Sequence, residues 1–195
     1  GSQKGEGIGN ASHYFSFTRM ATQGTVVLKG REFKVSGTSW MDREYSSNQL
    51  NKNQVGWDWF SFKFDDGAEL MLYQIRLKTG GIDPFSSGTY IDQDGVGHPL
   101  KREQFEIRPT GTWTSEHSEI VYPSGWEIHV PSKKLKLHIE PDVKDQELYA
   151  LRSINRSYWE GSVSIDGNEA GKPLSGKGYV ELVGYGKALE QHLPD

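Results

Sequence analysis

Cysteine is absent from this chain of 195 residues, so neither disulfide bonds nor thiolate chemistry is available to it. The sequence also lacks a long apolar run, and its mean hydropathy of −0.67 predicts no membrane-spanning helix. Basic residues do not exceed acidic ones, since 22 Lys and Arg against 26 Asp and Glu give a formal net charge of −4. Without a basic stripe, we do not expect a nucleic-acid partner.

Aromatic residues and glycine are frequent by contrast, with 6 Trp, 9 Tyr, 8 Phe and 23 Gly. Short aromatic or β-branched runs alternate with turn signals such as DDG, QDG and IDGN, which is typical of antiparallel β-structure. The expected strands cover residues 11–18, 24–29, 32–40, 57–64, 68–77, 103–108, 125–130, 134–140, 156–165 and 178–184. We predict an all-β fold, a closed barrel or a sandwich of about eight to ten strands.

No linker or internal repeat divides the chain, so we expect one domain over residues 11–186. Residues 1–10 are expected to form a flexible segment, and their first two residues, Gly-Ser, look like a cloning remnant. Residues 187–195 are expected to form a tail in which 187–192 is the one candidate for a short helix.

The clearest element is a hairpin of Trp57–Phe64 and Ala68–Leu77, joined by the turn Asp65-Asp66-Gly67. Strand alternation places Asp58 on one face with the three phenylalanines, and Trp57 and Trp59 on the other face. Neither face is purely polar. Either a barrel encloses a cavity lined by aromatics and a few polar groups, or a sandwich has its second face covered by another element.

Charged residues interrupt the aromatic stretch 37–47, where Asp42 and Glu44 are expected on one side of the strand and Arg43 on the other. In a structural role these groups form ion pairs, and Arg43 would pair with Glu160 or Glu181. In a functional role, a carboxylate among tryptophans has a raised pKa and donates a proton.

Asp58, between two tryptophans, is better placed to act as an acid, although Gln74 or Arg76 could satisfy it across the hairpin. Glu160 and Glu181 also alternate with aromatics, and they are either an acid–base pair or partners of buried arginines. No G-x-S-x-G motif is present and the six histidines are scattered, so we expect neither serine hydrolysis nor a metal, and no cofactor.

Several segments together resemble the AttH/carotenoid 1,2-hydratase (CrtC-like) family. They are SHYFSFTRMATQGTVVLKGREFKVSGTSWMDREYSS, GWDWFSFKFDDGAELMLYQIRL, SSGTYIDQDG, YPSGWEIHVP, DQE, YWEGSVSIDG and GYVELVGY, in the family's order from about residue 12 to 186. The resemblance implies a lipocalin-like antiparallel β-barrel, the second of two that such proteins carry in tandem. A missing N-terminal barrel or a homodimer partner is therefore expected, together with a secreted or periplasmic location.

The resemblance also implies a hydrophobic small-molecule ligand, with hydratase (lyase) chemistry on an alkene or polyene, or cyclase chemistry of the Diels–Alder type. Alkene hydration requires a proton donor beside aromatic faces, because π-systems stabilise a nearby cation. The family's hydratase motif reads Trp-x-Asp-His-x-Trp, and residues 40–45 read Trp-Met-Asp-Arg-Glu-Tyr. Arg43 thus replaces the histidine, and an arginine does not donate protons near neutral pH.

These considerations give two sets of candidate residues. The catalytic candidates are Asp42, Glu44, Asp58 and Tyr73. The substrate-binding candidates are Trp40, Arg43, Tyr45, Trp57, Trp59, Arg76 and Trp159. The alternative to an enzyme is a non-catalytic binding or transport module whose cavity holds a lipid-like ligand, and a third hypothesis is a purely structural barrel that serves as an interface for its partner domain.

Overall fold

A computed structural model describes residues 2–5, 11–45, 50–149 and 157–186. The chain divides into two compact units, residues 1–49 and 50–195. The single domain expected over residues 11–186 stays a prediction, and the helix expected at 187–192 lies outside the described residues. No helix in the described part of the chain is long and apolar enough to cross a membrane.

The first unit is a three-stranded antiparallel sheet in the order β1-β2-β3. Its strands are β1 (Ser2–Gln3), β2 (Ala11–Leu28) and β3 (Arg31–Tyr45). Where the sequence predicted separate strands at 11–18 and 24–29, β2 is continuous, with one register shift between Phe17 and Met20. Lys29 and Gly30 form the turn, and both have positive φ, as the tight hairpins that match strand twist require.

The far end of the β2–β3 hairpin has an apolar face. Val26 lies opposite Phe33, and Gly24 lies opposite Val35, so these side chains project to the same side as Leu28. All four apolar side chains are exposed. The guanidinium of Arg31 covers part of this face, 5.0 Å from the centre of the Phe33 ring.

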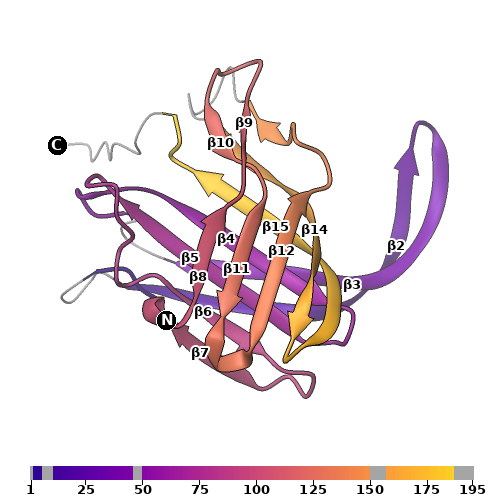
Figure 1. Ribbon diagram of the computed structural model, residues 1–195. Coiled ribbons are helices and arrows are strands. Elements are labelled where there is room, and N and C mark those ends of the chain that lie inside the picture. Colours follow the sequence, from indigo (N-terminus) through magenta and orange to yellow (C-terminus); the bar gives the residue numbers. More distant parts are fainter. Residues whose placement is uncertain (1, 6–10, 46–49, 150–156, 187–195) are drawn as a thin grey trace. The chain divides into compact units, whose positions relative to one another are not determined.

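The second unit is built on one antiparallel sheet that curls into a half-barrel (Figure 1). The strand path is β7-β6-β5-β4-β15-β14-β12-β11-β8, and β13 also pairs with β14. This architecture confirms the predicted antiparallel, lipocalin-like β-fold. The strands are β4 (Gln54–Phe64), β5 (Glu69–Leu77), β6 (Ser87–Ile91), β7 (Gly97–Lys101), β8 (Glu106–Pro109), β9 (Thr112–Thr114), β10 (Val121–Pro123), β11 (Trp126–Val130), β12 (Leu135–Pro141), β13 (Glu147–Leu148), β14 (Tyr158–Glu169) and β15 (Lys172–Val183).

The predicted hairpin is present as β4 and β5, in a register that places Trp59 opposite Tyr73. Gly67 closes the turn at φ +91°, and the backbone N–H of Ala68 donates to the Asp66 carboxylate. The short strands β6 and β7 were not expected. Two single-turn 3₁₀ helices, η1 (Arg102–Gln104) and η2 (Pro131–Lys133), connect strands, so β8 begins at Glu106 rather than at 103.

The core fills the inside of the curled sheet. Phe60 of β4 meets Trp126 of β11 edge to face, with ring centres 5.7 Å apart, and Trp126 lies 6.2 Å from Trp159 of β14. All three side chains are almost completely buried, as are Leu72 and Ile139 on other strands. Strands from the two halves of the sheet path therefore pack against each other through one continuous apolar layer.

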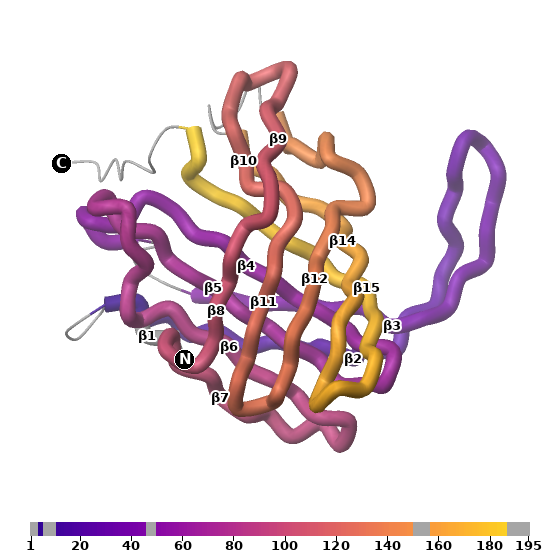
Figure 2. Tube along the Cα trace, viewed as in Figure 1, coloured from indigo at the N-terminus to yellow at the C-terminus, as the bar shows by residue number. Residues whose placement is uncertain are grey.

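The ribbon of β8 and β11 extends into a second, two-stranded ribbon of β9 and β10 (Figure 2). Tyr122 lies opposite Trp113 in this extension, and their rings stack with centres 6.1 Å apart. Tyr122 is nearly fully buried. The β9–β10 ribbon is thus joined to the core by its aromatic pair.

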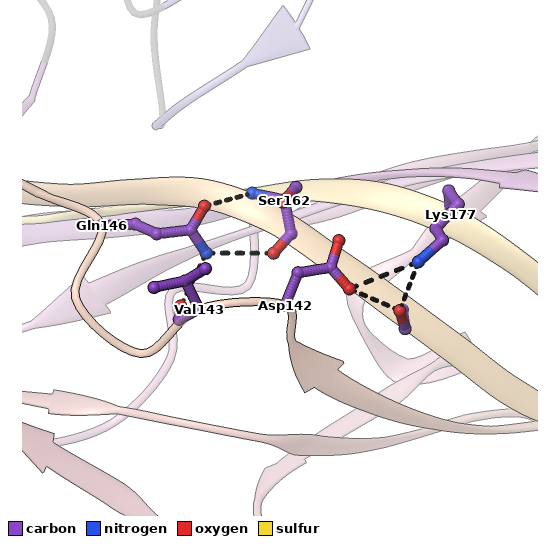
Figure 3. A network of polar contacts seen from close by, with 6 residues as sticks. Asp142, Val143, Gln146, Ser162 and Lys177 are labelled. Atoms are coloured by element: carbon purple, nitrogen blue, oxygen red, sulfur yellow. Dashed lines mark hydrogen bonds and ion pairs between the residues drawn. The ribbon is translucent and has the colours of Figure 1, made fainter.

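A glutamine side chain continues the ladder between β12 and β13 along β14 (Figure 3). The amide of Gln146 accepts from the backbone N–H of Ser162 at 2.9 Å and donates to the carbonyl of Ser162 at 3.0 Å. It also donates to the Val143 carbonyl at 2.8 Å. The amide of Gln146 takes the place of a backbone peptide group where the loop leaves the sheet. Residue 161 is a glycine, and a Cβ there would lie 2.1 Å from the Gln146 side chain.

Candidate active site

Asp58 is a buried carboxylate on the inner face of β4, held by polar groups of two neighbouring segments. Gln74 of β5 lies directly opposite and donates to one carboxylate oxygen, Oδ2, at 3.1 Å. The hydroxyl of Tyr185, just after β15, donates to the same oxygen at 3.2 Å. The Nε of Arg76 lies 3.2 Å from the other oxygen, Oδ1. The sequence analysis named Gln74 or Arg76 as the partner of Asp58 across the hairpin, and both side chains contact it.

Burial raises the pKa of Asp58 above the ordinary aspartate value. Arg76 lowers this pKa through its charge, and the hydrogen bonds from Gln74 and Tyr185 lower it further, but burial is the largest effect. The sequence favoured the opposite balance, in which Arg76 would keep the carboxylate ionised. In the folded protein, burial makes Asp58 easier to protonate than an exposed aspartate, which is the direction that a proton donor uses.

Arg76 is fixed above an aromatic ring. Its guanidinium carbon lies 3.6 Å from the centre of the Tyr185 ring, and its Nη2 donates to the backbone carbonyl of Val183. Gly56 makes this approach possible, because a Cβ there would lie 2.0 Å from the Val183 oxygen and 2.5 Å from Nη2. The register shift of β4 between Gln54 and Gly56 lies at this point.

Behind Tyr185 lies a second layer that includes another carboxylate. The rings of Tyr185 and Tyr122 are 5.7 Å apart, and the Tyr122 hydroxyl donates to Glu147 at 2.9 Å. Glu147 also accepts from the hydroxyls of Ser115 and Ser118. Burial raises the pKa of both tyrosines, so both stay protonated hydrogen-bond donors. Glu147 therefore connects the loop between β9 and β10, through Ser115 and Ser118, to Tyr122, whose ring contacts Tyr185.

The other predicted residues of this unit divide between the two faces of the sheet. Trp159 shares the inner face with Asp58, since both align with Leu182, and its indole N–H donates to the Lys144 carbonyl at 2.8 Å. Trp57, Trp59 and Tyr73 lie on the opposite face of the same hairpin. The Tyr73 hydroxyl donates to the backbone carbonyl of Phe85 at 3.2 Å.

The carboxylates Glu160 and Glu181 lie directly opposite each other on β14 and β15, in register with Trp59. Burial raises the pKa of Glu160, while a hydrogen bond from Tyr158 lowers it. This row is on the face away from Asp58, so the two glutamates do not belong to the Asp58 cluster.

The predicted residues of the first unit form contacts within that unit. Asp42 accepts hydrogen bonds from the indole of Trp40 at 2.8 Å, from Tyr14 at 2.6 Å and from Ser16 at 2.5 Å. Glu44 pairs with Lys4. Asp42 thus connects the two strands of the hairpin, and Glu44 connects β3 to the segment that follows β1.

Arg43 lies on the other side of β3, as predicted, with its guanidinium 4.9 Å from the centre of the Tyr45 ring. Arg43 also donates to the Tyr45 hydroxyl. Its expected pairing with Glu160 or Glu181 stays a prediction, because those residues belong to the second unit.

Sequence analysis missed Tyr185 and Glu147. Tyr185 is the last residue of the GYVELVGY segment, and Gly184 at φ +81° turns the chain just before it. The GYVELVGY segment was the only sequence signal for Tyr185. Because 127 positions separate Tyr185 from Asp58, local strand patterns could not place the two residues together. In the described part of the chain, no group of three or more His, Asp or Glu side chains is arranged to hold a metal ion.

The outer surface of the sheet also carries a polar groove of about 540 Å³. Its lining includes side chains of both charges from four adjacent strands, namely Glu106, Arg108, Glu127, His129, Lys136, His138, Asp166 and Asn168. Arg108 and Glu127 form an ion pair there, and His138 lies 3.0 Å from Glu140. Neighbouring side chains thus neutralise several of these charges.

The family model described as AttH-like matches residues 1–185. The chain belongs to the AttH-like family. A solved structure provisionally named an AttH, from Nitrosomonas europaea, is 35% identical with a TM-score of 0.84; the match covers 95% of this chain and 56% of that one. Kievitone hydratase from Nectria haematococca is 21% identical with a TM-score of 0.75, and the match covers 93% of this chain and 54% of that one.

The chain thus spans little more than half the length of either solved relative. At 21% identity, the likeness to kievitone hydratase shows the fold alone. A comparison with curated proteins found no match. The family prediction from the sequence is confirmed.

Proposed function

We propose that this AttH-like chain carries an acid–base site that acts on a carbon–carbon double bond of an apolar small molecule, with Asp58 as the proton-transferring group. The observation that carries the proposal is the Asp58 cluster: a buried carboxyl with a raised pKa, held by Gln74, Arg76 and Tyr185. A site that adds water to an alkene needs such a carboxyl beside aromatic side chains.

The packing around Asp58 limits how a substrate reaches it. Trp126 and Trp159 fill the inside of the sheet and are almost completely buried. The Arg76 side chain keeps 17% of its surface exposed, against 5% for Asp58. A substrate would therefore approach from the side of Arg76 and Tyr185.

The hydratase named among the structural relatives supports this class of reaction, since its fold is shared across 93% of the chain. The substrate, the substrate pocket and any cyclase activity of the Diels–Alder type belong to the proposal and not to the comparison. A second lipocalin-like barrel as a partner domain also belongs to it, because the relatives are almost twice as long.

The test compares wild type with Asp58→Asn, using β-methylstyrene as an apolar alkene and mass spectrometry in ¹⁸O-labelled water to detect the alcohol. Asp92→Asn is the matched control, because Asp92 contacts His98 on the surface hairpin β6–β7. We expect labelled alcohol from wild type and from the control, and loss of product without loss of alkene binding in Asp58→Asn. Full activity in Asp58→Asn would contradict the assignment.

A non-catalytic binding module is the second candidate. It is favoured by the observation that both oxygens of Asp58 already contact protein groups, as in a structural ion pair. Alkene binding without product formation in wild type would support this alternative.

A further inference from the structure

The sign of the charge beside Asp58 limits the reactions that this site can catalyse. Addition of a proton to a simple alkene creates a carbocation, which an aromatic face can stabilise. The face of the Tyr185 ring, however, is already occupied by the guanidinium of Arg76, 3.6 Å from its centre. A substrate carbocation near Asp58 would meet a fixed positive charge, so we expect hydration of a simple alkene to be slower here than reaction of a substrate that develops negative charge.

The same arrangement suits a substrate that develops negative charge. An arginine has five N–H donors. Among the described residues, Nη2 of Arg76 donates to the Val183 carbonyl, and Nε lies 3.2 Å from Asp58 without forming a hydrogen bond. The guanidinium is rigid and always charged, which makes it suitable for binding a developing oxyanion.

We infer that the Asp58–Arg76–Tyr185 cluster acts on a double bond conjugated to a carbonyl group, with Arg76 as the group that binds the carbonyl oxygen. This inference rests on the proposed function and deepens it by naming the substrate class: an apolar α,β-unsaturated ketone or a related conjugated carbonyl compound, rather than an isolated alkene.

The chemistry balances without an added oxidant or reductant. Water attacks the β-carbon, while the π electrons of the double bond move onto the carbonyl oxygen beside Arg76. The Asp58 carboxyl donates its proton to the α-carbon as the enolate collapses to the carbonyl, and the resulting carboxylate takes up a proton from the added water. Water is added in total, and Asp58 returns to its initial state.

The second half of this sequence can be measured without water addition. Benzylacetone, a saturated apolar ketone, exchanges its α-protons for deuterium when the Asp58 carboxylate removes a proton and Arg76 stabilises the enolate. We expect wild type to accelerate this exchange in D₂O, observed by proton NMR, above the rate in protein-free buffer. Arg76→Met is expected to lower the accelerated rate by about 100-fold, the effect of removing one oxyanion donor.

Arg102→Met is the matched control. Arg102 also lies over an aromatic ring, 5.4 Å from the centre of Phe105, and donates to the Phe105 carbonyl at 2.8 Å, but it has no place in the Asp58 cluster. We expect exchange in this variant at the wild-type rate. A loss of exchange equal to that of Arg76→Met would overturn the inference.

A second measurement needs no variant, in case Arg76→Met does not fold. Phenylbutyrate and phenylbutylamine have the same apolar body and opposite charge. We expect wild type to bind the carboxylate more tightly than the ammonium ion, measured by calorimetry. Tighter binding of the amine, or no binding of phenylbutyrate, overturns the inference.

The outcomes separate this inference from the proposed function. Hydration of β-methylstyrene without exchange of benzylacetone overturns the substrate class and leaves Asp58 as the acid. Exchange without hydration of β-methylstyrene supports the conjugated carbonyl substrate. Absence of both reactions overturns both proposals.

Discussion

Tyr185 contacts two opposite charges at once: its ring lies beneath the Arg76 guanidinium, and its hydroxyl donates to the Asp58 carboxylate. The two contacts can be removed one at a time. Tyr185→Phe keeps the ring and removes the hydrogen bond, which should lower the free energy of unfolding by about 1 kcal/mol. Tyr185→Leu also removes the aromatic face and should cost roughly a further 0.5–2 kcal/mol. Urea denaturation measures both, and equal losses in the two variants would show that the ring contributes nothing.

The raised pKa of Asp58 predicts how stability depends on pH. Because the folded protein binds this proton more tightly than the unfolded chain, the contribution is fully present below the ordinary value of 3.8 and is lost as pH rises through the folded-state pKa. Asp58→Asn lacks this titration. We therefore expect wild type to lose stability relative to Asp58→Asn as pH rises through this window, measured by urea denaturation at a series of pH values. A relative gain of wild type would mean that Arg76 lowers the pKa instead.

Gly56 is predicted to tolerate no side chain. A Cβ there would lie 2.0 Å from the Val183 carbonyl oxygen, so Gly56→Ala must displace β15 or Arg76 and should destabilise the protein by about 1–3 kcal/mol. The control is Gly97→Ala on β7, where the added Cβ would meet only a Thr89 methyl group at 3.4 Å. The two melting temperatures should differ clearly. Similar values would mean that the backbone near Gly56 relaxes without cost.

Much of the second unit follows from local patterns in the sequence. The β4–β5 hairpin could be predicted because a DDG turn joins two runs with alternating faces, and its register brought Asp58, Gln74 and Arg76 together. The strands β6 and β7 were missed because each has five residues, and β7 contains glycine, histidine and proline instead of β-branched residues.

The remaining parts of the site depend on contacts distant in sequence. Tyr185 reaches Asp58 only after the whole sheet has curled, and Glu147 reaches Tyr122 from a two-residue strand. Whether burial or the charge of Arg76 has the larger effect on the pKa of Asp58 likewise depends on the three-dimensional packing, which strand alternation does not give. The length of β2 was underestimated because the polar run Thr-Gln-Gly at 22–24 looks like a turn, although its backbone pairs throughout.

Gln146 provides a test of a side chain that acts as backbone. Gln146→Glu keeps the shape but places oxygen against the carbonyls of Val143 and Ser162, so we expect a loss of about 1–3 kcal/mol in unfolding free energy at neutral pH. Part of this loss should be recovered at acidic pH, where the new carboxyl is protonated and can donate. Gln104→Glu is the control, because Gln104 accepts from the Lys101 backbone N–H and a carboxylate can do the same. An equal loss in both variants would argue against this role of the amide.

The half-barrel ends in two strands, β7 and β8, at the ends of the described strand path. Both are short, and each contains a proline, Pro99 in β7 and Pro109 in β8, which cannot donate a backbone hydrogen bond. Charged side chains accompany them, with Lys101 on one strand and Glu106 and Arg108 on the other. Short, charged, proline-containing borders hinder the addition of a strand from another molecule. The borders of this open sheet therefore disfavour edge-to-edge polymerisation.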